Sequence, residues 1–329
     1  MKKEVEELQS LGVSGVFKES FNLIFTRPKI FTLISLYLLL PLSLIFLAHF
    51  HVSQLIFFNI LHNQASLHRA PQDSQTRAIL SDILFSQWTS FFLLKFAYFT
   101  FLLSLSLLST STVVYTVASI YASANVTFRK VMDVVSKVWS NLLITFNWNI
   151  ALVFAYNVVS GLLFIFWLSV IGFDDSLGLI IGGILFLLYL IGFVYVTIIW
   201  HLASVISVLE DSHGRQAMTK GNELMKGKKG TSIVVSCVIL LCFLGIQLGF
   251  EIFVVIGLRV GREVRIGVAI LGLICLLMVI LLGLVVQTVL YFVCKSYHHE
   301  HVDKSSLADH HGDYVPLRAR YVQSPENPV

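Results

Sequence analysis

The chain contains little charge. Only 13% of its 329 residues are charged, whereas 56% are apolar, and the mean hydropathy is +0.82. A soluble domain of this length needs a larger charged surface to stay in solution. The apolar residues also fall in six blocks of about 20 residues or more, the length that crosses a bilayer. The composition therefore excludes a soluble protein and predicts an all-α membrane protein with about six transmembrane helices.

Net charge and cysteine are also scarce. The formal net charge of +4 is small for the length, which argues against direct nucleic-acid binding. All four cysteines fall in predicted spans or at a span end: Cys237, Cys242, Cys275 and Cys294. A disulfide framework is therefore not expected, and buried apolar side chains are the ordinary use of such residues. Cys294, beside Lys295 at a predicted cytosolic helix end, is a candidate for palmitoylation.

Motifs that carry catalysis or hold cofactors are missing. No His/Glu pair spaced four apart lies in a predicted span, no Gly-x-Ser-x-Gly turn occurs, and no glycine-rich phosphate loop with a lysine is found. Residues 298–313 are rich in His and Asp, but ligand types without a folded scaffold are more typical of a polar tail than of a metal site. We therefore predict no enzyme, no catalytic residue, no cofactor and no metal.

The apolar blocks divide the chain into three parts. Residues 1–29 are expected to form a cytosolic lead with an amphipathic helix, residues 30–294 a six-span transmembrane domain, and residues 295–329 a disordered cytosolic tail. Pro41 is expected to kink the first span because proline lacks a backbone N–H and clashes with the preceding turn. The predicted spans are residues 30–49, 90–122, 141–171, 177–209, 231–257 and 266–294.

Lys and Arg concentrate on one side of the predicted domain. The lead holds 5 of them, residues 123–140 hold 3, residues 210–230 hold 5 and the tail holds 4, together 17 of the 23 in the chain. Cytosolic loops carry such an excess, so both termini are expected in the cytosol. The run from Arg259 to Arg265, on the other side, disagrees with this orientation. The pattern fits an integral protein of the endomembrane system or plasma membrane and indicates no oligomeric state.

A basic, half-apolar stretch precedes each odd-numbered span. Apolar or small residues recur at offsets 0, 4 and 7 from Phe17, Phe128 and Ala217, which is one face of a helix. The spacing predicts amphipathic helices on the cytosolic headgroups and, with them, three hairpin repeats. Ordinary basic linkers without a repeat are the alternative. Candidate lipid-facing basic residues are Arg129, Lys130, Lys137, Lys226, Lys228 and Lys229.

Few ionisable residues lie within the predicted spans. Lys95 and Glu251 both lie near the non-cytosolic boundary, so they are a candidate intramembrane pair across two helices. Separate snorkelling of the two side chains to the interface is the simpler alternative. His201 follows Trp200 near a cytosolic span end, where such a pair is ordinary.

Several sequence runs carry a family resemblance. They are WHLASVISVLED at residues 200–211, TRPK at 26–29, FRKVM at 128–132 and CKSYHH at 294–299. These runs resemble a family of uncharacterised plant multi-pass transmembrane proteins over nearly the whole chain. A more distant similarity is to the membrane region of bacterial glycerophosphodiester phosphodiesterases, whose catalytic domain has no counterpart here. The resemblance implies no activity and no catalytic residue.

Members of the plant family are sometimes labelled as partners of poly(A)-binding protein, which directs attention to the tail. A candidate peptide motif there comprises Leu307, Asp313, Tyr314 and Pro316. Its spacing is similar to that of the peptide read by the MLLE domain of poly(A)-binding protein, where a Leu and an aromatic residue fill two pockets. The tail departs from that peptide at Ala308, His311 and Tyr314, and a disordered polar tail without this role is the alternative.

The sequence favours a non-enzymatic integral membrane protein that acts as a scaffold or in trafficking or membrane organisation. Its expected partners are the lipid bilayer and a cytosolic protein that binds the tail. The alternative is a small-solute transporter or channel, in which Lys95, Glu251, Asn149 and Asn157 line the path. A water-accessible cavity that reaches Asn149 and Asn157 would favour transport, and a tightly packed bundle would favour the scaffold.

Overall fold

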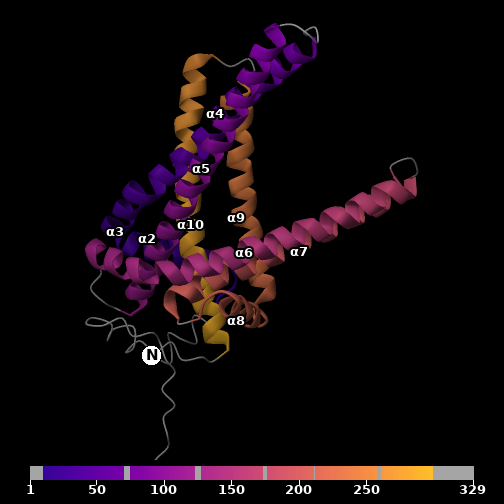
Figure 1. Cartoon of the computed structure of the whole chain (residues 1–329). Helices are drawn as coiled ribbons and strands as arrows, with labels where there is room; N and C mark the ends of the chain where they lie inside the picture. The colour runs from indigo at the N-terminus through magenta and orange to yellow at the C-terminus, as the bar shows by residue number, and fades with distance from the viewer. Residues whose placement is uncertain are drawn as a thin grey trace, which may run out of the picture. The chain divides into compact units, whose positions relative to one another are not determined.

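The described part of the chain is entirely helical. The computed structural model describes residues 10–69, 75–122, 127–172, 176–210, 212–257 and 261–298, and every regular element in these ranges is a helix (Figure 1). Six segments are long and apolar enough to cross a membrane, which confirms the predicted all-α class and the predicted number of span-length helices in this part of an integral membrane protein. They are Pro28–Arg69, Arg77–Tyr121, Phe128–Val170, Ser176–Leu209, Lys229–Val255 and Arg262–Tyr297.

Three of the helices run well beyond the predicted spans. The first helix continues 20 residues past residue 49, and the second begins 15 residues before residue 90. A helix can continue beyond the hydrocarbon layer, so the predicted span bounds stay predictions. Residues 128–140 are the first turns of the continuous helix α6 (Phe128–Val170) and not a separate surface helix. A helix satisfies its backbone groups internally on both sides of the hydrocarbon boundary, so it does not have to end where hydropathy falls.

Pro41 lies just after a widened turn. The chain runs from α3 (Pro28–Ile34) through the π-helix η1 (Ser35–Leu39) into α4 (Leu40–Arg69), and the Leu40 N–H donates to the carbonyl of Ser35. A proline within an α-helix removes one hydrogen bond and crowds a carbonyl four residues earlier. The π turn moves the pairing by one residue at this point, so helical structure continues through the proline.

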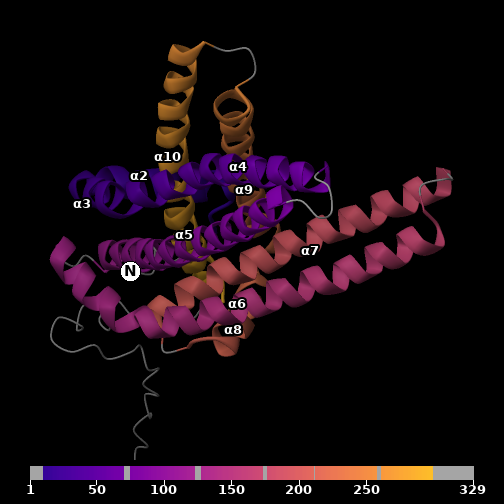
Figure 2. The same cartoon turned by 45° about the horizontal axis from the view of Figure 1, so that its top comes forward.

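The first of two compact units comprises Met1–Ile30, Thr110–Val238 and Leu282–Val329. Its helices are α2 (Val13–Thr26), α6, α7 (Ser176–Leu209) and α8 (Arg215–Met225), together with parts of α5 (Gln75–Tyr121), α9 (Lys229–Phe250) and α10 (Arg262–Tyr297). Figure 2 shows α6 and α7 side by side along their length, as an antiparallel hairpin, with α8 against them. The Tyr156 hydroxyl donates to the carbonyl of Tyr189 at 2.7 Å, and the buried Trp167 covers Gly182.

The second unit comprises Phe31–Ser109 and Ile239–Leu281. It holds η1, α4, the first part of α5, the end of α9, the π-helix η2 (Glu251–Val255) and the first part of α10. The buried residues Leu47, Phe250 and Leu276 form its core. Amides of Asn63 and Gln87 join α4 to α5 at 3.0 Å, so polar groups along these long helices pair with one another.

The predicted apolar faces are only partly correct. In α8 the predicted residues Ala217, Gly221 and Leu224 are all buried. In α2, Phe21 is 44% exposed, and the buried residues are Val16, Ser20 and Leu23. In α6 the buried residues of the first turns are Val131, Val135 and Val138. In α2 and α6 the packed face is therefore offset from Phe17 and Phe128, the residues from which the spacing was counted, although Val135 lies on both faces.

We predict that Gly182→Ala destabilises the hairpin of α6 and α7, whereas Gly183→Ala does not. A Cβ at Gly182 would lie 2.6 Å from the Trp167 ring, whereas one at Gly183 meets nothing within 4 Å. Overpacking costs roughly 1–3 kcal/mol, and both variants gain the same helix propensity of about 0.5–1 kcal/mol. Thermal unfolding in detergent measures the difference. Equal melting temperatures for the two variants would contradict the packing described here.

Candidate functional site

The turn that leads into α8 is held against α6. Gly214 has a φ of +59°, a backbone conformation that favours glycine. Its N–H donates to the Thr145 hydroxyl at 2.7 Å, and that hydroxyl is also 2.7 Å from the Ser207 hydroxyl of α7. A Cβ on Gly214 would meet the Trp148 ring at 2.8 Å. The start of α8 is therefore fixed by contacts to α6, and Thr145 links this turn to α7 through Ser207.

Helix α8 packs one face on α7 and leaves the other outward. A Cβ at Gly221 would lie 3.3 Å from the backbone of Ala203 and of Ile199, so glycine permits the close approach of the two helices. The outward face carries polar and charged side chains: Arg215, Gln216, Thr219, Lys220 and Glu223. The 11 residues of α8 therefore form a helix with one buried face and one exposed polar face.

A buried charge network joins α8 to the ends of α7 and α10. Glu210 Oε1 accepts hydrogen bonds from Lys295 Nζ at 2.7 Å and from the Tyr291 hydroxyl at 2.6 Å. Glu210 Oε2 pairs with Lys220 Nζ at 2.7 Å. Glu210 is 6% exposed, Lys295 9% and Tyr291 1%, so one carboxylate collects donors from two other helices in a site with little water.

The environment of Glu210 keeps its carboxyl group ionised. Burial by itself raises the pKa of this group. The charge of Lys295 and the hydrogen bonds from Lys220, Lys295 and Tyr291 outweigh that effect, and the pKa of Glu210 is lowered. A carboxylate whose pKa is lowered and whose two oxygens are both paired is suited to holding helices together.

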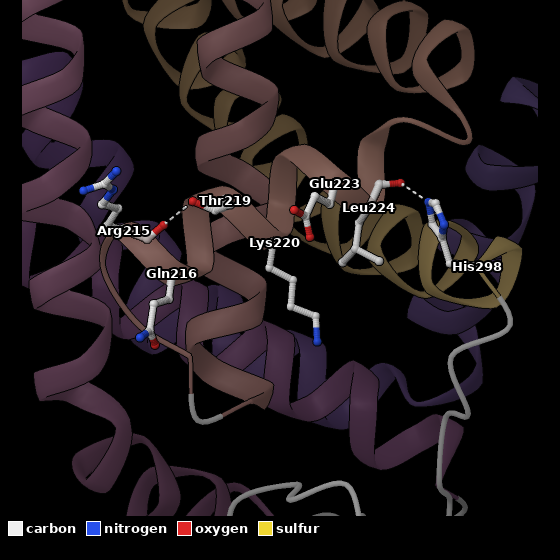
Figure 3. A pocket seen from close by; sticks show the side chains of 7 residues that line it. All are labelled: Arg215, Gln216, Thr219, Lys220, Glu223, Leu224 and His298. Carbon is white, nitrogen blue, oxygen red and sulfur yellow. Dashed lines mark hydrogen bonds between the residues drawn. The ribbon is translucent and has the colours of Figure 1, made fainter.

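An open pocket of about 650 Å³ lies on the outward face of α8. Six of its lining residues come from α8, and His298 comes from the chain just after α10. Figure 3 shows Gln216 and Lys220 extending from the same side of the helix, and His298 facing Leu224 from the other wall. The His298 Nε2 lies 3.2 Å from the Leu224 carbonyl, and since a carbonyl only accepts, this nitrogen carries the hydrogen.

The predicted basic residues have different surroundings. The side chains of Arg129, Lys130, Lys137, Lys226 and Lys229 are exposed. Lys228 is only partly exposed. Its Nζ lies 5.8 Å from the centre of the Tyr297 ring and 3.5 Å from the Leu11 carbonyl. This side chain therefore packs against other residues of the first compact unit.

The predicted pair of Lys95 and Glu251 is wrong. Lys95 Nζ instead lies 2.9 Å from His49 Nε2 and 3.0 Å from the Ser53 hydroxyl. The His49 ring stacks on Tyr98 with centroids 3.5 Å apart. Helices α4 and α5 are antiparallel neighbours. His49 and Ser53 are four residues apart and so lie on the same face of α4, and this face contacts Lys95 on α5.

Two further predictions concern the end of the chain. Cys294, the candidate for palmitoylation, is a free thiol with a buried side chain in the structure, and its modification stays a prediction. The candidate tail motif of Leu307, Asp313, Tyr314 and Pro316 lies outside the described residues. In the part of the chain that is described, no group of three or more His, Cys, Asp or Glu side chains is placed to hold a metal ion.

The sequence did not indicate that Glu210, Lys220, Tyr291 and His298 lie in one region of the structure. One local signal was present. Glu210 directly follows an apolar span, and Tyr291 and Lys295 are four residues apart at the end of another span. That spacing places two polar groups on the same helix face. Nothing in either local pattern indicates that the two span ends meet.

Comparison with known proteins identifies a family but no activity. A family model described as "Domain of unknown function (DUF8558)" matches residues 1–326, nearly the whole chain. No curated protein and no solved structure matches the chain. The resemblances drawn from the sequence runs therefore stay predictions.

We predict that Glu210→Gln strongly destabilises the protein, whereas Glu223→Gln on the exposed face of α8 has little effect. Removing one partner of a buried ion pair costs roughly 3–5 kcal/mol because the other charge is left uncompensated. Thermal unfolding in detergent at neutral pH measures both variants. A loss for Glu210→Gln no larger than for Glu223→Gln would show that the network does not hold these helices.

The same network predicts a pH dependence. Because the pKa of Glu210 is lower in the folded than in the unfolded chain, its stabilisation is complete above the ordinary carboxyl pKa of about 4.3 and is lost as pH falls through the lowered value. Acidification should therefore lower the melting temperature of the unmodified protein more steeply than that of Glu210→Gln. Parallel acid melting curves for the two proteins would contradict this assignment.

Proposed function

We propose that this chain, which belongs to the family described as "Domain of unknown function (DUF8558)", is a non-enzymatic integral membrane protein that acts as a scaffold or in trafficking or membrane organisation. In this proposal both termini lie in the cytosol and a cytosolic tail recruits a protein partner. The membrane belongs to the endomembrane system or is the plasma membrane. The observation that carries the proposal is the saturated Glu210 network, which joins α7, α8 and the end of α10.

The network supports a mechanical role because it lies at the root of the tail. Tyr291 and Lys295 are in the last turns of α10, where the helix meets the predicted tail of residues 295–329. A partner bound to a tail that leaves a rigid helix end is held at a fixed place on the membrane surface. A tail that left a frayed end would not be. Both oxygens of the Glu210 carboxylate are used in these contacts between helices.

The orientation rests on charge. The basic segments before the odd-numbered spans and after the last span carry most of the lysine and arginine of the chain, and the exposed Arg129, Lys130 and Lys137 lie on the first turns of α6. Anionic lipids of the cytosolic leaflet attract such residues. This side is therefore the cytosolic side in the proposal.

A threefold organisation forms part of the proposal. Buried residues recur at offsets 0, 4 and 7 in three stretches, starting at Val16, Val131 and Ala217. The first and third stretches precede a pair of span-length helices, and the middle one forms the first turns of the span-length helix α6 that opens the second pair. This recurrence supports three units, each made of an amphipathic stretch and a transmembrane hairpin.

A small-solute transporter or channel is the second candidate. The contacts of Lys95 with His49 and Ser53 favour it, because ionisable groups within spans often line a path for ions or protons. Against it, Asn149 is 4% exposed and Asn157 hydrogen-bonds to the Val153 carbonyl and the Tyr189 hydroxyl. Neither asparagine lines the pocket on α8.

We predict that deleting residues 299–329 removes the protein partner without unfolding the membrane domain. Proximity labelling from the C-terminus in the native cell, compared between the full chain and the deletion, should lose a set of cytosolic proteins. The double variant Leu307→Ala, Tyr314→Ala tests the MLLE-like motif, and binding of the 300–329 peptide to an MLLE domain provides the direct titration. An unchanged label set after the deletion would contradict the recruiting role of the tail.

A separate measurement tests the transporter. In sealed proteoliposomes the unmodified protein should show no flux of protons or small ions above empty vesicles, and Lys95→Met should behave the same. A flux that the unmodified protein supports and Lys95→Met abolishes would replace the scaffold by the second candidate.

A further inference from the structure

We infer that the pocket on the outward face of α8 binds the phosphorylated polyol headgroup of an anionic membrane lipid. The inference rests on the proposed function only in that it places α8 at the cytosolic surface of the membrane. The pocket is lined by two cationic side chains, Arg215 and Lys220, and by groups that hydrogen-bond to hydroxyls. Its volume of about 650 Å³ lies within the roughly 300–1,000 Å³ of ordinary small-molecule sites.

Aromatic side chains indicate the depth of α8 in the membrane. The Tyr195 hydroxyl donates to Asn222 of α8, the Trp148 ring covers the turn at Gly214, and the Tyr297 ring lies against Gly227 just after α8. Tyr and Trp favour the level of the lipid headgroups, where an apolar ring and a polar edge are both satisfied. The helix is thus bracketed by residues typical of the interface, and its outward polar face meets headgroups.

The charge around the pocket favours a phosphate. Arg215 offers a guanidinium, which binds phosphate oxygens in pairs, and Lys220 adds the positive charge of an ammonium that is already paired with Glu210. Lys220 lies 2.7 Å from Glu210, but that carboxylate is also neutralised by Lys295, so the network keeps a surplus positive charge beside the pocket. The exposed Lys226 and Lys229 add to the positive potential one turn beyond.

The remaining lining residues favour hydroxyl groups on the same ligand. Glu223 carries a carboxylate that repels a second phosphate but accepts hydrogen bonds from sugar-like hydroxyls. Gln216 offers an amide, and Thr219 a hydroxyl that already donates to the Arg215 carbonyl and still accepts. Leu224 provides an apolar floor, and the His298 Nε2 is committed to the Leu224 carbonyl. A headgroup with one or two phosphates and several hydroxyls fits this set better than phosphatidic acid or phosphatidylserine.

The test uses the full-length protein in nanodiscs of phosphatidylcholine that contain a few per cent of phosphatidylinositol 4-phosphate, phosphatidylserine or phosphatidic acid. Native mass spectrometry counts the lipids bound and gives their relative affinities. We expect preferential binding of phosphatidylinositol 4-phosphate and a loss of about tenfold or more in Arg215→Gln, since a hydrogen bond between charged groups contributes about 1.5–3 kcal/mol. Glu223→Gln should reduce the preference over phosphatidic acid.

The matched control is Lys229→Gln, which removes an equal charge near the pocket but does not line it. It should change the affinity less than about threefold, as expected for a screened surface charge. Unchanged binding in Arg215→Gln, an equal loss in both variants, or equal affinity for phosphatidylserine would overturn the assignment. Melting temperatures of both variants, compared with the unmodified protein, exclude a loss of fold as the cause.

A second arm separates the lipid from a soluble ligand. Inositol 1,4-bisphosphate is titrated into the detergent-solubilised protein, and weak or undetectable binding is expected because the acyl chains cannot contribute. An affinity equal to that of the lipid would overturn the lipid assignment in favour of a soluble polyol phosphate. Recruitment of the tail partner is measured separately, so that failure of the headgroup site and failure of the scaffold proposal are distinguished.

Discussion

The structure depends on one constraint, the absence of water around peptide groups inside the bilayer. Each backbone N–H and C=O in the six apolar segments must find its partner within the chain, and a helix does this locally. The same constraint reaches the polar side chains. Thr116 and Ser207 each donate to the carbonyl four residues earlier in the same helix. Even at Pro41 the chain keeps helical pairing through a π turn and does not expose a backbone group.

Charged side chains follow the same rule at higher cost. Glu210 and Lys295 are nearly buried, and their charges are compatible with this only because each has a partner and Tyr291 completes the set. Lys95 finds His49 and Ser53 on the neighbouring helix. An unpaired charge in either place would face a desolvation penalty of several kcal/mol. The two clusters therefore specify which helix faces meet, besides whatever they contribute to stability.

The region around α8 combines these effects at a surface. Its buried face uses small residues, with Gly221 against α7, while the turn at Gly214 is tied to Thr145. Lys220 connects the outward polar face to the buried network through Glu210. The side chains that fix the helix thus also determine the charge of the pocket beside it. This coupling explains how a short helix with a small apolar face can present a fixed set of polar groups on its outward side.

The sequence alone determined the helical class, the six membrane-crossing segments and the packed face of α8, because hydropathy and helical periodicity are local properties. It did not give the full length of the first two long helices, since helix length is limited by backbone pairing and not by hydropathy. Only the tertiary structure decided that Lys95 meets His49 and not Glu251, that the Cys294 thiol is buried, and that Glu210 joins Tyr291, Lys220 and Lys295. Those contacts depend on the rotation and neighbours of each helix, and uniformly apolar spans carry almost no information about either, because lipid and a packed helix solvate the same side chains equally well.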